Sequence, residues 1–351
     1  MSKKSPEELT EKLSAFLQRS HEARSVAIDN LRLLTGGASR QTWSFDAAIE
    51  HPDGRRESLP LVMRSDIREG STGSNTRDVE YKVLEAAYDE VVPVPKMHLM
   101  GDGSVGMPFF LMERVEGETI ARRLLRDEQY AQAREALTSQ LAEALAIVHR
   151  VPIDQPNLDG LPPPAPETNL AELELDRFET SYRAITLDPH PAFEIAFRWL
   201  RRNLPPTGGP RLVHGDFRIG NIIFGPEGLR SVLDWEIAHI CDPMEDLAWL
   251  CVRAWRFGND DLPVGGIGTR EDLWKAYEAA GGNKVDPAAA LWWEVFGNLR
   301  WGIITIMQSR AFLDESTRKR LPSASQLELA AIGRRTAETE WELLDLIERQ
   351  S

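Results

Sequence analysis

The chain has 351 residues, of which 42% are hydrophobic and 27% charged, and its formal net charge at pH 7 is −14. This length and composition indicate a globular protein with one large domain or two modest ones. The acidic balance argues against a nucleic-acid-binding protein, because such proteins present a basic face that replaces the counterions of the phosphates. The two cysteines, Cys241 and Cys251, are too few for a disulfide framework and lack the spacing of a zinc site.

The N-terminal residues predict an amphipathic helix that ends near Arg19. Ser5 precedes Pro6 and two glutamates, which is a capping signal, and the apolar positions that follow recur on one helical face. A signal peptide would need an apolar run here, and no run of about 18 apolar residues follows. We therefore expect a cytoplasmic protein that does not enter a membrane.

A small antiparallel sheet is expected next. Five short segments are rich in β-forming residues and are bounded by glycine or proline: 30–34, 41–49, 59–63, 96–100 and 108–113. A helix over about 76–88 separates the third segment from the fourth. Sheet and helix together predict a compact nucleotide-binding domain, residues 1–116.

Residues 117–351 are predicted to form a larger, mainly helical domain. Apolar residues keep helical spacing in seven segments: 127–150, 170–187, 191–203, 244–257, 270–280, 287–309 and 325–349. The segment 151–168 contains six prolines and predicts a stiff surface loop outside the core. In the last helix we expect Trp341, Leu344 and Ile347 to face inward, with the acidic residues solvated. The predicted fold class is α+β.

Two short apolar strands carry the polar residues that indicate chemistry, in LVHGDFRIGNIIF (212–224) and SVLDWE (231–236). In phosphoryl transfer, one carboxylate accepts the proton of the attacking hydroxyl, while a second carboxylate and an amide oxygen hold magnesium against the phosphates. Asp216, Asn221 and Asp234 supply that set, because one loop presents the first two and a hairpin returns the third beside them. The alternative is a hairpin whose acidic residues only cap turns.

The segments HGDFRIGN, LDWE and CDPMEDLAWL resemble those of the aminoglycoside phosphotransferase and choline kinase superfamily. Together with FFLMERVEG, they resemble the kinase-like domains that some proteins carry fused to acyl-CoA dehydrogenases. The resemblance covers nearly the whole chain. It implies a two-lobed, protein-kinase-like fold, with ATP and Mg²⁺ between the lobes and the substrate among the C-terminal helices.

The resemblance also assigns the nucleotide site. It places a phosphate loop at residues 35–40, with Gly36, Gly37 and Ser39, although the sequence lacks G-x-G-x-x-G and a plain hairpin turn explains two glycines equally well. Arg64 ends a strand where the family most often has lysine. We expect it to pair with Glu80, which lies alone on an apolar helix face; two unrelated surface charges are the alternative.

The segment after residue 108 resembles the hinge between kinase lobes. By position, the carbonyl of Glu113 and the N–H of Val115 would meet the nucleotide base, and Met112 would line the pocket behind it. Because backbone atoms read the base in such hinges, the side chains do not distinguish ATP from GTP. GTP therefore remains open as the phosphoryl donor.

Several residues near the expected base have two interpretations. Arg218 could offset negative charge in the transition state, or it could form a salt bridge to the region of Asp242 and Glu245. We expect Asp246 to brace the catalytic loop through its N–H groups, and His214 to be structural. Glu236 could contact the metal through water or contact the substrate.

The sequence therefore predicts a kinase that phosphorylates a hydroxyl of a small molecule. An inactive kinase fold that only binds ligands should lack Asp216, Asn221 or Asp234, and all three are present. A protein kinase should have the glycine-rich signature and an activation segment ending in APE, and both are absent. The acceptor stays open between a hydroxyacyl-type metabolite and an aminoglycoside. The tryptophan-rich helices between residues 246 and 301 are expected to offer a mixed apolar pocket.

Overall fold

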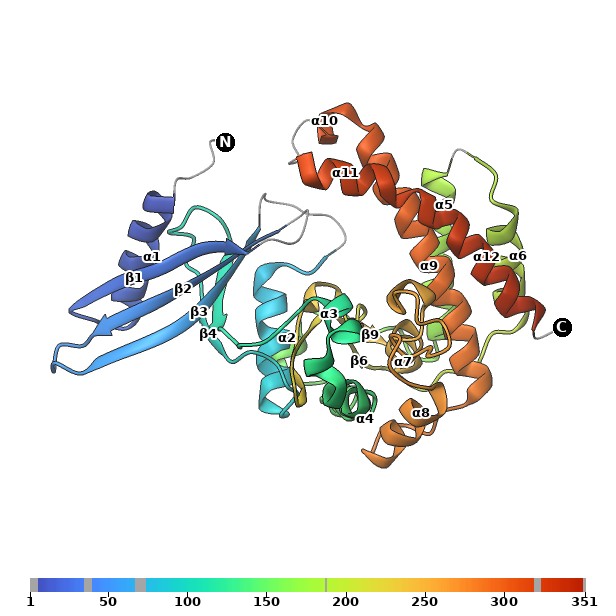
Figure 1. Ribbon diagram of the computed structural model, residues 1–351, viewed down its shortest axis with the longest axis horizontal. Helices are drawn as coiled ribbons and strands as arrows, with labels where there is room; N and C mark the ends of the chain where they lie inside the picture. The colour runs from blue at the N-terminus through green and yellow to red at the C-terminus, as the bar shows by residue number, and fades with distance from the viewer. Residues whose placement is uncertain (1–5, 35–39, 67–73, 187, 319–322, 350–351) are drawn as a thin grey trace.

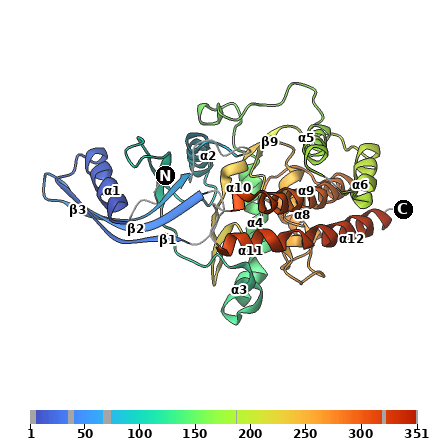
Figure 2. The same cartoon turned by 90° about the horizontal axis from the view of Figure 1, so that it is seen from above.

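The computed structural model describes residues 6–34, 40–66, 74–186, 188–318 and 323–349. Its N-terminal part is a five-stranded antiparallel sheet in the order β1-β2-β3-β5-β4. The strands are β1 (Ser25–Leu34), β2 (Arg40–Glu50), β3 (Arg56–Asp66), β4 (Met97–Met100) and β5 (Phe109–Glu113). Figures 1 and 2 show this sheet at one end of the molecule and most of the helices at the other.

The sheet separates two apolar layers because successive side chains of a strand point to opposite faces. Leu61 and Met63 of β3 pack with α1 (Pro6–Ser20), whose buried residues are the predicted stripe Leu9, Leu13, Phe16 and Leu17. Val62, between them, packs with α2 (Arg77–Asp89) on the other face. Arg64 follows the same alternation and therefore lies on the α2 face.

The C-terminal part is a helical bundle around one long central helix. The helices are α3 (Ala121–Arg126), α4 (Ala131–Val148), α5 (Leu170–Ile185), α6 (Pro191–Arg202), α7 (Met244–Trp249), α8 (Arg270–Ala279), α9 (Pro287–Leu313), α10 (Glu315–Arg318), α11 (Ser323–Ile332) and α12 (Arg334–Glu348). Most residues in the first five turns of α9 are buried, as expected for a helix surrounded by others. Within the described residues, no helix is both long and apolar enough to cross a membrane.

Two short, two-stranded sheets carry the polar segments identified in the sequence. In the first, β6 (Arg211–Val213) pairs with β9 (His239–Cys241); in the second, β7 (Ile222–Gly225) pairs with β8 (Gly228–Val232). Both pairs are antiparallel. Figure 1 shows β6 and β9 between α2 and α9.

Several element boundaries differ from the predictions. β1 begins five residues earlier than expected, and the helix expected at 127–150 is shorter, because Asp127 ends α3 and a 3₁₀ turn precedes α4. The helix expected at 244–257 ends at Trp249, and Gly333 divides the last one into α11 and α12. These breaks occur where local turn hydrogen bonds compete with a helical pattern that the apolar spacing alone would continue.

Two predictions about which residues are buried were wrong. The proline-rich segment 151–168 is not outside the core, because Leu158 and Leu161 are buried there and Gly160 approaches Val79 of α2. In α12, Leu343 and Leu346 face inward instead of Trp341 and Leu344, which are exposed; Ile347 is buried as expected. The apolar core also continues from α2 into the bundle, and the boundary at residue 116 stays a prediction.

Candidate active site

The candidate catalytic loop runs from β6 to β7 and begins with a left-handed glycine. Gly215 has φ +81°, and a Cβ at this position would lie 2.7 Å from the carbonyl oxygen of Ile237. Only glycine fits without strain. His214 is buried, donates through Nε2 to the Leu233 carbonyl (2.8 Å) and accepts from the Asp216 N–H through Nδ1 (3.1 Å). His214 is thus structural, as expected, and ties this loop to the strand end before Asp234.

The carboxylate of Asp216 is held by three side chains. Asn221 donates through Nδ2 to Oδ2 (2.6 Å) and to the Asp216 carbonyl (2.9 Å). The indole N–H of Trp249 donates to Oδ1 (2.7 Å), and Arg218 Nε lies 3.1 and 3.3 Å from the two oxygens. The predicted pair of Asp216 and Asn221 therefore meets, and Arg218 binds Asp216 instead of Asp242 or Glu245. The role of Arg218 in catalysis stays a prediction.

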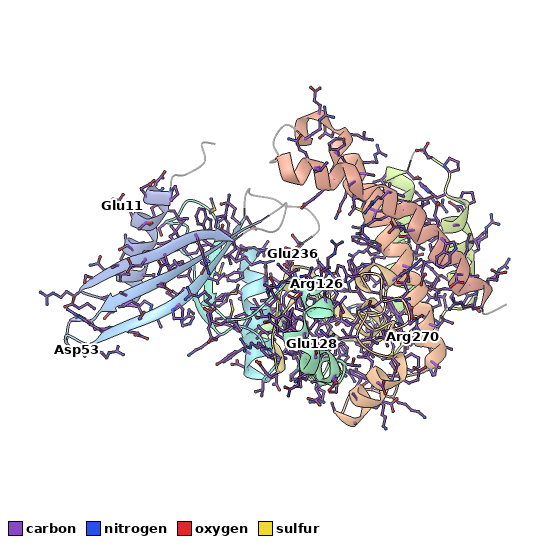
Figure 3. All side chains as sticks on the ribbon, viewed as in Figure 1. Glu11, Asp53, Arg126, Glu128, Glu236 and Arg270 are labelled. Atoms are coloured by element: carbon purple, nitrogen blue, oxygen red, sulfur yellow. The ribbon has the colours of Figure 1, made fainter. Side chains whose placement is uncertain are left out.

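A second cluster of charges lies where α2, β3 and the end of β8 meet; we call it the junction cluster, consisting of Arg64, Glu80, Asp234 and Glu236. Arg64 Nε lies 3.1 Å from Glu80, which confirms the expected ion pair, and its Nη2 contacts Asp234 and lies 3.3 Å from Glu236. Glu80 also binds Arg77. One arginine thus bridges three carboxylates, of which Asp234 and Glu236 are partly exposed. Figure 3 labels Glu236 in this region.

The junction cluster shifts the acidity of its members. Burial raises the pKa of Asp234, but the charge and the hydrogen bond of Arg64 outweigh it, so the pKa lies below its ordinary value. Burial opposes the charge of Arg64, yet Glu80 and Asp234 hold its pKa above the ordinary value. Asp234 therefore stays an anion at neutral pH. Its backbone is left-handed (φ +71°), which costs free energy for a residue other than glycine and is common at functional sites.

Oxygen atoms are available for a magnesium ion at this place. The amide nitrogen of Asn221 is committed to Asp216, which leaves the amide oxygen as the atom that could ligate a metal. The backbone N–H of Leu233 donates to the Asn221 carbonyl (2.8 Å). This hydrogen bond holds the backbone before Asp234 close to Asn221. An oxygen-only pair of ligands fits Mg²⁺, which completes its shell with water and phosphate.

The predicted nucleotide residues are only partly described. Gly36, Gly37 and Ser39 lie outside the described residues. Met112 is buried and lies opposite Val62 in the sheet, which puts it on the same face as Arg64. In the hinge segment, the Glu113 N–H donates to the Lys96 carbonyl (2.8 Å), and Val115 follows, half-buried. The contacts of Met112, Glu113 and Val115 with a nucleotide base stay predictions.

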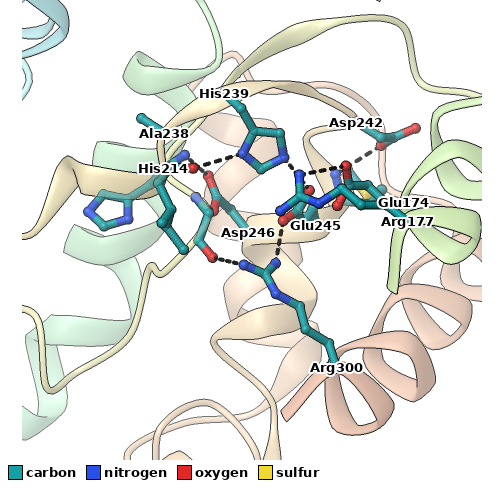
Figure 4. A network of polar contacts seen from close by, with 12 residues as sticks. Glu174, Arg177, His214, Ala238, His239, Asp242, Glu245, Asp246 and Arg300 are labelled. Carbon is teal, nitrogen blue, oxygen red and sulfur yellow. Dashed lines mark hydrogen bonds and ion pairs between the residues drawn. The ribbon is translucent and has the colours of Figure 1, made fainter. Parts of the chain in front are cut away.

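Another, buried set of polar residues contacts the loop, and we call it the support cluster: His149, Asp246, Glu245 and Arg300. Figure 4 shows Asp246, Glu245 and Arg300 of this cluster together with His214. Asp246 accepts from the N–H groups of His214 (2.7 Å) and Gly215 (2.9 Å), which confirms the expected brace. His149 Nε2 lies 3.2 Å from Asp246 and its Nδ1 lies 2.7 Å from the Tyr277 hydroxyl. The loop is therefore fixed by its backbone from beneath.

Arg300 of α9 links the loop to Trp249, which binds the Asp216 carboxylate. Its Nη2 donates to the Gly215 carbonyl (3.0 Å), its guanidinium lies 4.6 Å from the Trp249 ring centre, and its Nη1 binds Glu245. Glu245 also binds His239 (3.2 Å). Burial lowers the pKa of His239, but the charge of Glu245 outweighs it and raises the pKa to about 9.

Sequence reasoning did not assign His149, Trp249, Tyr277 or Arg300 to the site. Trp249 would have been the easiest of them to predict, because it follows Asp246 by three residues and therefore lies near the same face of α7. The other three come from α4, α8 and α9, and no local pattern connects those helices with residues 214–216.

Comparisons with known proteins agree on one family. The model of the phosphotransferase enzyme family matches residues 31–282. Mouse (Mus musculus) acyl-CoA dehydrogenase family member 10 is 30% identical over 211 residues, which are 56% of this chain and 19% of the relative. The chain thus spans about a fifth of the length of that relative.

Solved structures share the fold. A protein from Ralstonia eutropha JMP134, provisionally assigned as an aminoglycoside phosphotransferase, superposes with a TM-score of 0.70 at 25% identity, covering 96% of this chain and 98% of the other. A thermostable mutant of an aminoglycoside phosphotransferase, in a ternary complex with ADP and hygromycin B, superposes with a TM-score of 0.57 at 17% identity, covering 92% and 98%. The chain therefore belongs to the phosphotransferase enzyme family, as a small-molecule kinase with a two-lobed, protein-kinase-like α+β fold.

Proposed function

We propose that this kinase transfers the γ-phosphoryl group of ATP to a hydroxyl of a small molecule, with Asp216 as the general base. The hydroxyl oxygen attacks the γ-phosphorus, the bond from that phosphorus to the bridging oxygen breaks, and ADP leaves. The hydroxyl proton passes to the Asp216 carboxylate. The observation that carries this proposal is that Asn221 binds Asp216 within one loop and that the indole N–H of Trp249 orients the Asp216 carboxylate.

The other predicted residues have defined parts in the proposal. Asn221 and Asp234 would hold Mg²⁺, which neutralises charge on the phosphates when it is bound. Arg64, held by Glu80, would contact the α- and β-phosphates. Arg218 would stabilise negative charge near the acceptor oxygen, because its guanidinium already lies beside the base. GTP remains an alternative donor, since the proposed hinge contacts are made by backbone atoms.

The acceptor is proposed to be less cationic than an aminoglycoside, and a hydroxyacyl-type metabolite is the leading class. A kanamycin-like polycation needs several carboxylates that are free to bind ammonium groups. On α12, Glu342 lies near Arg253 and Arg256, Glu338 lies near Arg335 and Asp345 pairs with Arg349, while Glu340 contacts His190. The name of the mouse relative, an acyl-CoA dehydrogenase family member, is consistent with an acyl acceptor.

A screen of hydroxylated compounds with γ-labelled ATP tests this proposal. The panel contains hydroxyacyl-CoA esters and aminoglycosides, and label in the acceptor is measured for the wild type and for Asp216→Asn. We expect Mg²⁺-dependent labelling of a weakly cationic acceptor, lost in the variant. Efficient turnover of an aminoglycoside, with kcat/KM on the order of 10⁴ M⁻¹s⁻¹ or above, would overturn the choice of acceptor. Labelling that does not depend on Asp216 would overturn the mechanism.

A further inference from the structure

A cavity of about 410 Å³ lies among α3, the loop at residues 253–260, α9 and α12. This volume is within the range of about 300–1,000 Å³ that is usual for small-molecule sites. Trp301 of α9 forms part of its wall, and the Trp301 ring centre lies 4.8 Å from that of Trp255. The same Trp255 ring lies 4.6 Å below the guanidinium of Arg218 and 5.4 Å from the ring of Trp249.

The packed rings of Trp301 and Trp255 therefore lie between the cavity and the proposed base. Arg218 and Trp249 both contact the Asp216 carboxylate, and both pack on Trp255. Trp255 also packs against Trp301, which lines the cavity. Because the Trp255 ring lies between Trp301 and Arg218, a compound that rests on Trp301 would have to extend past Trp255 to reach Asp216. The cavity is thus placed as an acceptor site next to the catalytic loop.

The charges in the cavity wall are balanced, although the chain has 55 acidic and 41 basic residues. The wall contains three arginines and three carboxylates: Arg122, Arg253, Arg335, Asp260, Glu338 and Glu342. All three carboxylates have guanidinium partners. Asp260 and Glu342 lie 2.8 and 3.6 Å from Arg253, and Glu338 lies 3.7 Å from Arg335. Ammonium groups of a ligand would have to compete with these arginines.

Arg122 of α3 differs from the other two arginines in the wall. Among the residues that the structure describes, it has no ion-pair partner, and its side chain is exposed. A guanidinium presents five N–H donors in a planar fork that matches carboxylate and phosphate oxygens. The cavity therefore offers one uncommitted cation at its edge and an apolar surface, Trp301 with Phe257, in its wall.

We infer that this cavity binds the acceptor and that the acceptor carries an oxyanion, a carboxylate or a phosphate monoester, in addition to the hydroxyl that is phosphorylated. Arg122 binds the oxyanion, the body of the compound packs on Trp301, and the hydroxyl points toward Asp216. This inference rests on the proposed function, because it assumes that Asp216 is the base. It goes beyond that proposal in naming the site and the charge of the substrate.

Four acceptors of equal chain length test the charge preference: 6-hydroxyhexanoate, 6-hydroxyhexyl phosphate, methyl 6-hydroxyhexanoate and 6-aminohexan-1-ol. We expect kcat/KM for at least one anion to exceed that for the ester by about tenfold or more, as one charge-assisted hydrogen bond allows. The carboxylate and phosphate compounds show which oxyanion is preferred. Saturation-transfer NMR with the same four compounds measures binding without turnover.

Arg122→Ala should remove the preference by lowering kcat/KM for the anion to about that for the ester. Arg126→Ala is the matched control on the same helix, because Arg126 pairs with Asp127 and does not line the cavity (Figure 3). Equal or better use of the ester or the amino alcohol would overturn the inference, as would a preference that survives in Arg122→Ala, or failure of all four compounds to bind. Asp216-dependent phosphorylation of the amino alcohol would leave the proposed function intact, whereas binding of an anion without Asp216-dependent transfer would contradict that function alone.

Discussion

The junction cluster lies where α2, β3 and the end of β8 meet, the support cluster binds the backbone of residues 214 and 215, and the two clusters differ in exposure. In the junction cluster, Arg64 bridges three carboxylates, and the side chains of Asp234 and Glu236 are 37% and 28% exposed. In the support cluster, Asp246 is fully buried and Arg300 is 4% exposed, and each has several partners. The junction cluster therefore has carboxylates near solvent, whereas the support cluster is buried.

This difference indicates different tasks. A partly exposed cluster with excess carboxylates can exchange one cation for another at modest cost, because water and ions compensate for the change. A buried cluster cannot, because a charge that loses its partner there stays desolvated. The junction cluster is therefore suited to receive Mg²⁺ and a nucleotide, while the support cluster is suited to hold residues 214–216 in one conformation.

The largest loss of activity is expected when the junction cluster loses Asp234, its proposed metal ligand. Asp234→Ala should abolish turnover and weaken binding of Mg²⁺ with nucleotide, while the fold persists, because Arg64 keeps Glu80 and Glu236. Isothermal titration calorimetry with Mg²⁺ and a non-hydrolysable nucleotide measures the change. Glu236→Ala is the neighbouring control, which should retain more affinity. Unchanged magnesium dependence in Asp234→Ala would remove this residue from the metal site.

The support cluster should respond in stability instead. Asp246→Ala leaves the His214 and Gly215 N–H groups and His149 without their acceptor, and we expect the free energy of unfolding to fall by about 3–5 kcal/mol. Urea denaturation followed by circular dichroism measures this. Asp53→Ala, in the exposed turn between β2 and β3, should change stability by less than about 0.5 kcal/mol. Equal effects of both variants would show that Asp246 is not a buried support.

A smaller effect is expected at Trp249, which lies between Arg300 of the support cluster and Asp216, the proposed base. Trp249→Phe keeps an aromatic ring near Arg300 but removes the N–H that binds Asp216 Oδ1. Hydrogen bonds to charged groups contribute about 1.5–3 kcal/mol, so kcat should fall roughly tenfold to a hundredfold, with little change in the KM for nucleotide. Trp274→Phe, on α8, should leave kcat unchanged. A matching drop in both variants would indicate general destabilisation.

The sequence predicted the two sets of residues unequally. The contact of Asp216 with Asn221 was predicted because both lie in one loop, and the pairing of Arg64 with Glu80 followed from a carboxylate on an apolar helix face. The roles of Asp216, Asn221 and Asp234 stay predictions. The support cluster joins residues far apart in the chain, such as Gly215 and Arg300, through contacts that only tertiary packing creates. Sequence patterns that repeat within one element cannot indicate them.

Prediction of the fold from sequence was limited in the same way. The stripe of α1 and the strand pattern of the sheet have regular periods and were predicted, whereas the burial of Leu158 in a proline-rich segment was not. Prolines exclude regular structure but do not prevent a loop from covering a neighbouring helix, here α2. The inward face of α12 was missed because Trp341 and Leu343 are both apolar, and only the neighbouring helices decide which of them is covered.

The smallest effect is expected from the coupling inside the junction cluster. Glu80 binds both Arg64 and Arg77, so Glu80→Ala alone changes two ion pairs. A double-mutant cycle of Arg64→Ala and Glu80→Ala on the dissociation constant for nucleotide isolates the first pair. We expect a coupling energy of about 0.5–3 kcal/mol, with the double variant less impaired than the sum of the singles. Strict additivity would mean that the pair does not act together in binding nucleotide.

The role of Asp216 as base is tested most directly by Asp216→Asn, measured as single-turnover phosphoryl transfer alongside the dissociation constant for Mg²⁺-nucleotide. The amide keeps the size of the side chain but accepts a proton poorly. We expect the rate of transfer to fall by roughly 10² or more, with nucleotide affinity nearly unchanged, because Asp216 is not a proposed nucleotide contact. A rate close to that of the wild type would exclude Asp216 as the base.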